Sequence, residues 1–279
     1  MKNSTLPPFA VVGGGNMAFA VLRGAAERGV IDLERCTVAD PDENRRSTYP
    51  RSVERTEDLI PAIVEAESEP GETAIFLAVK PQKLAAVAEQ LRPALLDAPG
   101  DRLVISILAG VNSVRVRDEL GKRVRVVRAM PNTPAQVGRG MTAICAGAGA
   151  MRGDDETAAT LFNAIGETAM IEESLFDAYT ALAGSGPAYV FYLAEAMRAA
   201  GVELGFDSVT ADRCVRQTIL GAAELLSHSD DPPEELRRRV TSPGGVTAAV
   251  TGHFDAKQMQ QTIIDAIRAG RDRGRELGK

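Results

Sequence analysis

Near its N-terminus the chain runs Phe9-Ala10-Val11-Val12-Gly13-Gly14-Gly15-Asn16-Met17-Ala18. The first four residues are apolar, and small or apolar residues continue at helical spacing up to Gly24, so this stretch predicts a buried strand, a glycine turn and a helix. The G-x-G-x-x-A pattern at the turn lets the backbone approach a pyrophosphate closely, and the helix N-terminus after it favours negative charge. The stretch therefore predicts the opening unit of a dinucleotide-binding domain.

An acidic residue follows the second expected strand. Residues 36–39 are apolar and β-prone, and Asp40 comes next, at about the distance from the glycine turn where such domains place a ribose-binding carboxylate. That carboxylate would accept from a ribose 2′-hydroxyl and repel a 2′-phosphate, and Arg45 and Arg46 can offset the repulsion. The alternative is that Asp40 only starts a turn before Pro41, and the sequence leaves both interpretations open.

Strands and helices then alternate up to residue 171. Further strands are expected at 73–79, 102–108, 124–129, 141–145 and 168–171, and helices at 84–96, 114–120 and 154–165. This alternation predicts an α/β domain with a doubly wound parallel sheet of the Rossmann type.

Ligands of such sheets bind along the carboxyl ends of the strands. Three segments leave the expected strands at that edge, and each carries Pro or Gly, which fixes an irregular backbone against a ligand. They are Val79-Lys80-Pro81, Leu108-Ala109-Gly110 and Met130-Pro131-Asn132-Thr133-Pro134. Lys80 is expected to meet a phosphate as a minor contact or merely to lie along the surface.

Strand signals stop after Glu172. Helical spacing of apolar residues begins at 175–182, resumes at 187–200 and 209–226, and ends with a helix that carries Met259 and Ile263 on one side. The Gly184-Ser185-Gly186-Pro187 run predicts a kink or a helix restart with Pro in the first turn. The expected division is an α/β domain over residues 1–173 and an all-helical domain over residues 174–279.

Composition is that of an ordinary globular protein of 279 residues. The net charge of −6 gives no electrostatic footprint for nucleic acid, and no apolar run approaches the ~20 residues that span a bilayer. The three cysteines are widely spaced and odd in number, which indicates reduced thiols. Together with the two histidines they form no metal-binding pattern. We expect no nucleic-acid, membrane or metal partner, and a cytoplasmic location.

A second candidate site lies in the helical half, where the chain runs Val240-Thr241-Ser242-Pro243-Gly244-Gly245-Val246-Thr247. Pro and the two glycines predict a tight loop, and the residues that follow can start a helix. The amides of Gly245, Val246 and Thr247 are then expected to be free at a positive helix end, which is a site for a carboxylate, with the Thr247 hydroxyl beside it. An α-amino or α-imino acid would fit. The alternative is a helix-breaking turn with a Ser or Thr cap.

Taken together, five motifs resemble the pyrroline-5-carboxylate reductase family. They appear in the family's order over essentially the whole chain, and the last is the most specific to it. They are Gly13-Gly14-Gly15-Asn16-Met17, Ala78-Val79-Lys80-Pro81, Met130-Pro131-Asn132-Thr133-Pro134-Ala135, Gly184-Ser185-Gly186-Pro187-Ala188-Tyr189 and Thr241-Ser242-Pro243-Gly244-Gly245-Val246-Thr247.

The resemblance implies reduction of 1-pyrroline-5-carboxylate to L-proline by NADPH or NADH, the last step of proline synthesis. It also implies a homodimer built through the helical domains, sometimes assembled further into a ring. Because Asp40 stands where the family often has a small polar residue, we expect NADH and NADPH both to be used.

The residues that match the family's sites are assigned as follows. Thr247 is the predicted catalytic residue, since its hydroxyl matches the family's hydroxyl near the substrate nitrogen. The predicted substrate-binding residues are Ser242, Gly244, Gly245, Val246, Thr247 and Glu173, of which Glu173 is matched only in some members. The predicted cofactor-binding residues are Gly13, Gly14, Gly15, Asn16, Met17, Asp40, Arg45, Ala78, Val79, Lys80, Pro81, Leu108, Ala109 and Asn132.

Two departures from the family are Val246, where Thr or Ala is usual, and Leu108, where Ala is usual, and both are expected to narrow the cleft slightly. Two other functions are weighed against the reductase. A hydroxyacid dehydrogenase would need a catalytic Lys about one helical turn beyond its Gly-Ser-Gly, where this chain has Tyr189-Val190-Phe191. A non-catalytic nicotinamide-binding protein would be expected to have lost Thr247 or its glycines, which are present.

Overall fold

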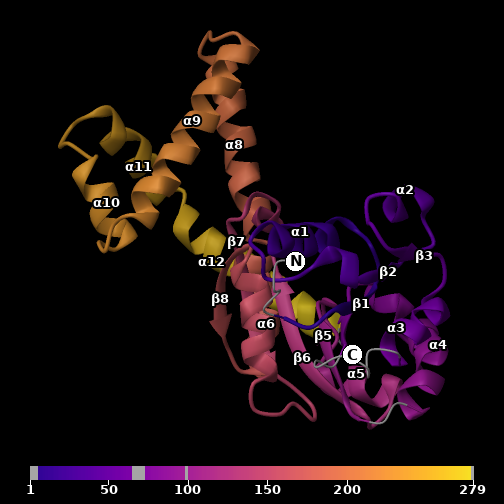
Figure 1. Cartoon of the computed structure of the whole chain (residues 1–279). Coiled ribbons are helices and arrows are strands. Elements are labelled where there is room, and N and C mark those ends of the chain that lie inside the picture. The colour runs from indigo at the N-terminus through magenta and orange to yellow at the C-terminus, as the bar shows by residue number, and fades with distance from the viewer. Residues whose placement is uncertain (1–5, 65–72, 98–99, 278–279) are drawn as a thin grey trace. The chain divides into compact units, whose positions relative to one another are not determined.

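The computed structural model describes residues 6–64, 73–97 and 100–277. Within these residues the strands form an eight-stranded sheet in the order β3-β2-β1-β4-β5-β6-β7-β8 (Figure 1). Their bounds are β1 (Phe9–Val12), β2 (Thr37–Ala39), β3 (Ser52–Val53), β4 (Ala74–Leu77), β5 (Arg102–Ser106), β6 (Val124–Pro131), β7 (Gly140–Ala146) and β8 (Gly166–Met170).

Helices connect these strands. They are α1 (Asn16–Glu27), α2 (Glu43–Arg46), α3 (Ile60–Val64), α4 (Leu84–Asp97), α5 (Ser113–Leu120) and α6 (Asp154–Asn163), with short 3₁₀ turns η1 (Leu33–Arg35), η2 (Thr56–Leu59), η4 (Pro81–Lys83) and η5 (Thr133–Val137). The predicted Rossmann-type α/β fold is confirmed. The sequence analysis did not predict α2, β3 and α3, each of which is only two to five residues long.

One strand pair departs from the parallel sheet expected from the sequence. All neighbours pair in parallel except β6 and β7, which are antiparallel, with Val127 opposite Ala146 and Pro131 opposite Thr142. The connection between them is only η5 and its flanking residues, and so short a link cannot return the chain to the start of a parallel strand. The parallel expectation is therefore wrong at this one pair.

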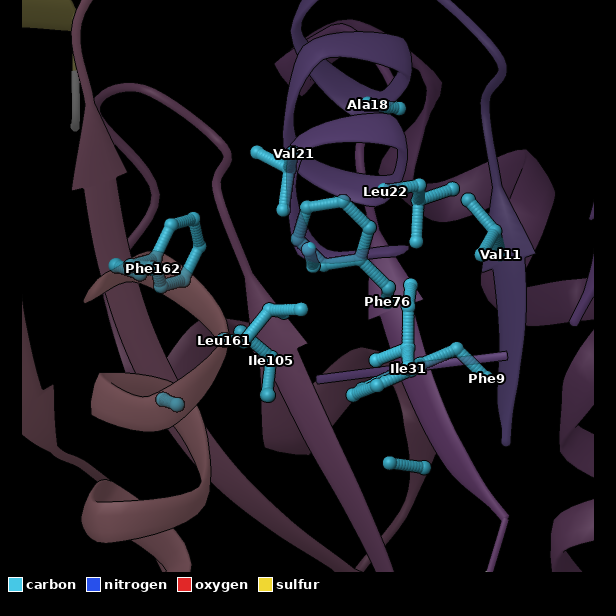
Figure 2. Close-up of a cluster of buried hydrophobic side chains, with 14 of the residues drawn as sticks. Phe9, Val11, Ala18, Val21, Leu22, Ile31, Phe76, Ile105, Leu161 and Phe162 are labelled. Carbon is cyan, nitrogen blue, oxygen red and sulfur yellow. The ribbon is translucent and has the colours of Figure 1, made fainter. Parts of the chain in front are cut away.

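The sheet buries apolar side chains on both faces. Successive strand residues point to opposite faces, so Phe9, Val11 and Phe76 pack with α1 and α6 on one side (Figure 2). Ala10, Val12, Ile75, Leu77 and Val104 pack with residues of α4 and α5 on the other. This two-sided burial is why the strands are continuous apolar runs instead of alternating ones.

The segment that follows β8 is irregular. A 3₁₀ turn η6 (Glu173–Leu175), a short helix α7 (Phe176–Tyr179) and a π-helical turn η7 (Thr180–Gly184) replace the single helical face expected at 175–182. The helix restart is confirmed, because α8 (Gly186–Glu203) begins after the π turn with Pro187 in its first turn.

Contacts divide the chain into two compact units, residues 1–184 with 270–279, and residues 185–269. The predicted boundary after residue 173 falls within η6. The second unit holds α8, α9 (Ser208–Ser227), α10 (Pro233–Arg239), α11 (Val246–Ala256) and the first part of α12 (Met259–Leu277), and α8 packs beside α9 (Figure 1). Among the described residues, no helix combines the length and apolar character that crossing a membrane requires.

Candidate functional site

The glycine turn between β1 and α1 is held by close backbone contacts. Gly13 has a φ of +98°, donates its amide to the carbonyl of Ala39 at 2.9 Å, and lies so near β4 that a Cβ would stand 2.7 Å from the carbonyl oxygen of Ala78. Only glycine adopts this conformation without strain and leaves room for that carbonyl. The predicted residues Gly13 and Ala78 are thus brought together at the carboxyl edge of the sheet.

The N-terminus of α1 fits an anion. Gly15 is its N-cap, no side chain caps the helix, and no acidic residue occupies the first turn. A Cβ on Gly15 would meet nothing within 4 Å, so the backbone is open to a ligand there. Within the described part of the chain, the amides of Gly15, Asn16 and Met17 have no acceptor. Free amides at a positive helix end fit a dinucleotide pyrophosphate.

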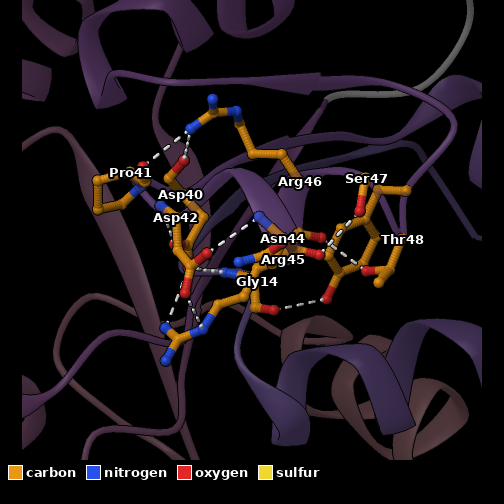
Figure 3. A network of polar contacts seen from close by, with 10 residues as sticks. Gly14, Asp40, Pro41, Asp42, Asn44, Arg45, Arg46, Ser47 and Thr48 are labelled. Carbon is orange, nitrogen blue, oxygen red and sulfur yellow. Dashed lines mark hydrogen bonds and ion pairs between the residues drawn. The ribbon is translucent and has the colours of Figure 1, made fainter.

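Asp40 is buried and its carboxylate is already bound. One oxygen accepts from the amide of Gly14 at 2.8 Å and the other from the amide of Asp42 at 2.9 Å (Figure 3). Arg45 approaches the same carboxylate at 3.5 Å, with about half of its side chain exposed. Asp40 therefore does start a turn, as the alternative interpretation held, and it also fixes the glycine loop.

Neighbouring side chains complete this network. Arg46 donates to the carbonyls of Asp40 and Pro41 at 2.9 and 3.0 Å, so Arg45, which also pairs with Asp42 at 3.5 Å, is the cation beside the Asp40 carboxylate. Tyr49 is buried against Gly14 and donates its hydroxyl to the Gly14 carbonyl at 3.2 Å. Sequence reasoning did not identify Tyr49, because it lies in a polar segment without periodicity.

The other predicted cofactor residues follow the carboxyl ends of the strands and differ in how far they are exposed. Lys80 and Ala109 are exposed, and Val79 and Pro81 are half-buried. Asn132 is buried, donates to the carbonyl of Ala183 at 3.0 Å and accepts from the amide of Met141 at 2.9 Å, so its amide group braces the loop.

Leu108 requires a correction. Its side chain is 1% exposed and packs in the core cluster beneath the sheet edge with residues of β4, β5, α4 and α5. The expectation that it narrows the cleft is wrong, because a buried leucine gains free energy in the core that it would lose at the edge.

The predicted carboxylate loop precedes α11. Gly244 has a φ of +68°, which favours glycine, and Gly245 is the N-cap of the helix. The amide of Gly245 is not free as expected: it donates to the carbonyl of Ser242 at 3.1 Å, closing the turn. Within the described residues, the amides of Val246, Thr247 and Ala248 are the ones without acceptors, so the candidate anion site lies one residue further along.

Thr247 is not a helix cap. It is the second residue of α11, whose N-cap is Gly245 and whose N-terminus has no side-chain cap. Its carbonyl accepts from the Thr251 hydroxyl at 2.9 Å, and within the described residues its own hydroxyl has no partner. The capping interpretation of this loop therefore fails for Thr247, which belongs to the first turn of α11 together with the free amides. Val246 is 84% exposed.

Glu173 lies in a polar cluster of the first unit. Its carboxylate accepts from the amide and the hydroxyl of Ser113, both at 2.6 Å, and pairs with Arg128 at 3.4 Å. Arg128 is buried and lies 4.4 Å from the ring centre of Phe176. Burial lowers the pKa of Arg128, and the Glu173 carboxylate opposes that shift. These contacts tie η6 to β6 and to the start of α5.

A groove of about 620 Å³ runs along α1, η5 and the two residues that follow α6, Ala164 and Ile165. Of the predicted site residues it includes Asn16, and Arg23, Arg28 and Gln136 supply other polar groups. The His, Cys, Asp and Glu side chains of the described ranges form no group of three or more that could hold a metal ion.

Comparison with known proteins identifies the family. A sequence model described as pyrroline-5-carboxylate reductase dimerisation matches residues 173–277, and one described as NADP oxidoreductase, coenzyme F420-dependent, matches residues 8–110. The chain is 37% identical to a pyrroline-5-carboxylate reductase of Pseudomonas aeruginosa over 98% of this chain and 97% of that protein. The chain belongs to the pyrroline-5-carboxylate reductase family.

Solved structures of the family agree. The structure of a pyrroline-5-carboxylate reductase from Coxiella burnetii is 31% identical, with a TM-score of 0.85 over 99% of this chain and 100% of that one. The Plasmodium falciparum pyrroline carboxylate reductase with NADP bound is 28% identical, with a TM-score of 0.85 over the whole of both chains.

The family membership confirms the predicted class of enzyme. This reductase is an NAD(P)H-dependent oxidoreductase, and the prediction of pyrroline-5-carboxylate reductase activity in proline synthesis is confirmed by its relatives. The non-catalytic alternative and the hydroxyacid dehydrogenase alternative are both disfavoured by these matches. The helical domain is a dimerisation domain, so the protein belongs to an oligomeric family.

Replacing Glu173 by Gln separates a structural from a substrate-binding role. The substitution leaves the buried Arg128 charge without its counter-ion, and we expect the free energy of unfolding to fall by about 3 kcal/mol, the lower end for a broken buried pair, because Glu173 is 27% exposed. The KM for the imino acid should stay unchanged. Chemical denaturation measures the free energy of unfolding, and steady-state kinetics measure the KM. Glu172→Gln, at the exposed neighbour, is the control, and a raised KM without lost stability would favour substrate binding.

Proposed function

We propose that this reductase holds the carboxylate of 1-pyrroline-5-carboxylate at the N-terminus of α11 while the C=N bond is reduced to give L-proline. The observation that carries this proposal is the set of free amides at Val246, Thr247 and Ala248, at a helix end with no acidic residue in its first turn. Such an end attracts a carboxylate through both its hydrogen-bond donors and its helix dipole. Ser242 lies at the rim of this loop and closes it through its carbonyl.

The dinucleotide is proposed to bind at the other site described above. The first turn of α1 holds the pyrophosphate of NADPH or NADH, with Gly13 and Gly14 giving the backbone its close approach. A bound nicotinamide would supply the hydride. Val79, Lys80 and Ala109, at the same sheet edge, are proposed to line the rest of the dinucleotide.

The role proposed for Thr247 is to orient the ring nitrogen. A protonated cyclic imine carries positive charge that hydride addition neutralises, so no oxyanion develops and no histidine is required as an acid. The Thr247 hydroxyl accepts a hydrogen bond from the ring N–H, since it has no partner of its own among the described residues. Most of the acceleration then comes from positioning and from the exclusion of water.

Replacing Thr247 by Ala tests this role in an assay of NADPH oxidation with 1-pyrroline-5-carboxylate. Loss of one oriented contact is expected to lower kcat about 10²-fold, with a smaller change in KM. Thr247→Ser keeps the hydroxyl and should keep most activity. The thermal midpoint should barely move, because Thr247 makes no capping bond.

Thr251 offers a matched control for this experiment. It lies one turn later on α11, and its hydroxyl donates to the Thr247 carbonyl instead of facing the free amides. Thr251→Ala should therefore retain the wild-type kcat. An alanine variant at Thr247 with wild-type turnover would remove that residue from the mechanism. A wild-type protein that reduces a 3-oxo acid but not the imine would overturn the proposed substrate.

The choice between NADPH and NADH is proposed to depend on Asp40 and Arg45. Asp40→Ser removes the carboxylate that repels a 2′-phosphate and releases the Arg45 guanidinium from one of its two carboxylate partners, each 3.5 Å away, so that it can bind the phosphate while Asp42 remains its other partner. We expect the ratio of kcat/KM for NADPH to that for NADH to rise about tenfold. The lost acceptor for the Gly14 amide weakens both cofactors and cancels in the ratio. Adding Arg45→Ala to this variant should abolish the rise in the NADPH to NADH ratio. If Asp40→Ser leaves that ratio unchanged, Asp40 only starts the turn and holds the loop.

We propose that the protein forms a homodimer through its helical domain and that these dimers assemble further into a ring. We also propose that it is located in the cytoplasm. The observation that supports the dimer is the exposure of large apolar side chains in residues 185–269, among them Phe191 at 67%, Leu225 at 70% and Leu204 at 80%. Apolar surface of this extent is typical of a face that a partner covers. The three free cysteines fit a reducing compartment.

Light scattering with a charged substitution tests the dimer. Phe191→Glu places a charge on the exposed apolar face of α8 and should shift the protein toward monomer at micromolar concentration, because a buried unpaired charge opposes association. Leu96→Glu, at a leucine 58% exposed in the α/β unit, should leave the mass unchanged. A wild-type protein that is a stable, active monomer would contradict the proposal.

A further inference from the structure

The peptide between Gly14 and Gly15 is the part of the dinucleotide loop that the structure controls from outside the glycine motif. The carbonyl of Gly14 and the amide of Gly15 belong to one planar trans peptide, so they point in opposite directions. The carbonyl is bound by the Tyr49 hydroxyl at 3.2 Å on the buried side of the loop. The Gly15 amide therefore points away from that buried side, and Gly15 itself has open space beside it, because a Cβ there would meet nothing within 4 Å.

The preceding peptide is fixed independently. The Gly14 amide donates to Asp40 at 2.8 Å, and the Gly13 amide donates to the carbonyl of Ala39 at 2.9 Å. Asp40 therefore sets the peptide between Gly13 and Gly14, whereas Tyr49 sets the next one. Two adjacent glycines give this second peptide little resistance to rotation of its own, because neither carries a Cβ.

The packing and the protonation state of Tyr49 allow its hydroxyl to hold the Gly14 carbonyl. Its ring lies against Gly14, where a Cβ would stand 2.9 Å from a ring carbon, and it packs edge to face on Phe19 of α1 with 5.8 Å between ring centres. Burial, with the Asp40 carboxylate nearby, raises the pKa of Tyr49 above its usual value, so the phenol stays protonated and remains a donor.

We propose that Tyr49 is a positioning residue for the dinucleotide: its hydroxyl holds the Gly14–Gly15 peptide in the orientation that aims the Gly15 amide at the cofactor pyrophosphate. This inference rests on the proposed binding of the dinucleotide at the first turn of α1. Without the hydroxyl, the peptide rotates among several orientations, and one of the donors to the anion is lost for part of the time. Tyr49 itself does not touch the pyrophosphate in this arrangement.

The test is a direct titration of the full-length protein with NADPH by calorimetry, in the absence of imino acid. Tyr49→Phe removes the hydroxyl and keeps the ring packing, and we expect the Kd for NADPH to rise about tenfold, the effect of one lost hydrogen bond. The Kd for NADH should rise by the same factor, because the pyrophosphate is common to both. In steady-state kinetics the KM for the cofactor should rise while the KM for the imino acid stays unchanged.

Tyr179→Phe is the matched control. Tyr179 is also buried in the first unit, and its hydroxyl also donates to a backbone carbonyl, that of Met141 at 2.7 Å, but its side chain packs in a separate cluster with Ala143, Cys145 and Phe176. Its loss should leave the Kd for NADPH at the wild-type value, with a thermal midpoint lowered about as much as in Tyr49→Phe.

Each outcome decides something. Equal affinity of Tyr49→Phe and wild type, or an equal loss in Tyr179→Phe, overturns the role of Tyr49 and leaves the proposed function standing. A loss confined to NADH or to NADPH would place the effect at the ribose, through Asp40, and also overturns it. A wild-type protein that binds neither dinucleotide removes the proposed cofactor site and this inference together.

Discussion

The contact between Gly13 and the carbonyl of Ala78 is the constraint on which the nucleotide-binding half depends. The parallel register pairs Val12 with Leu77, so the chain leaving β1 must pass directly over the carboxyl end of β4. A side chain at Gly13 would collide with that carbonyl, and the backbone there has a positive φ. Because the crossing is this tight, α1 begins at once and directs its free amides along the edge where ligands of such sheets bind.

The same constraint involves two residues outside the glycine motif. Gly14 lies between Asp40 and Tyr49, and each of them holds one end of its backbone. The buried carboxylate of Asp40 thereby starts a turn and holds the glycine loop, and it is also the charge that we propose to act on cofactor choice. A substitution there acts on several functions at once, which is why the relative use of two cofactors reports on its charge better than either rate alone.

The helical unit has the opposite character. Among its described residues only Ala211 and Val215 are buried apolar side chains, whereas large residues from Tyr189 to Ile264 are exposed. A set of helices with so thin a core of its own gains most of its apolar burial from a partner, which agrees with the match of residues 173–277 to a dimerisation domain. The loop before α11 sits on this unit and keeps its helix end uncapped by any side chain.

The sequence by itself determined the main elements and their order: the glycine turn, the alternating strands and helices, the restart at Pro187 and the helix that begins after Gly245. These follow from periodicity, glycine and proline, which act within a few residues. Only the tertiary structure decided that β6 and β7 are antiparallel, that Leu108 turns into the core, that the Gly245 amide closes a turn, and that Tyr49 and Glu173 hold distant backbone. Glu173 meets Ser113 across 60 residues and Asp40 meets Gly14 across 26, and partners so far apart are set by strand register and packing, which no local pattern encodes.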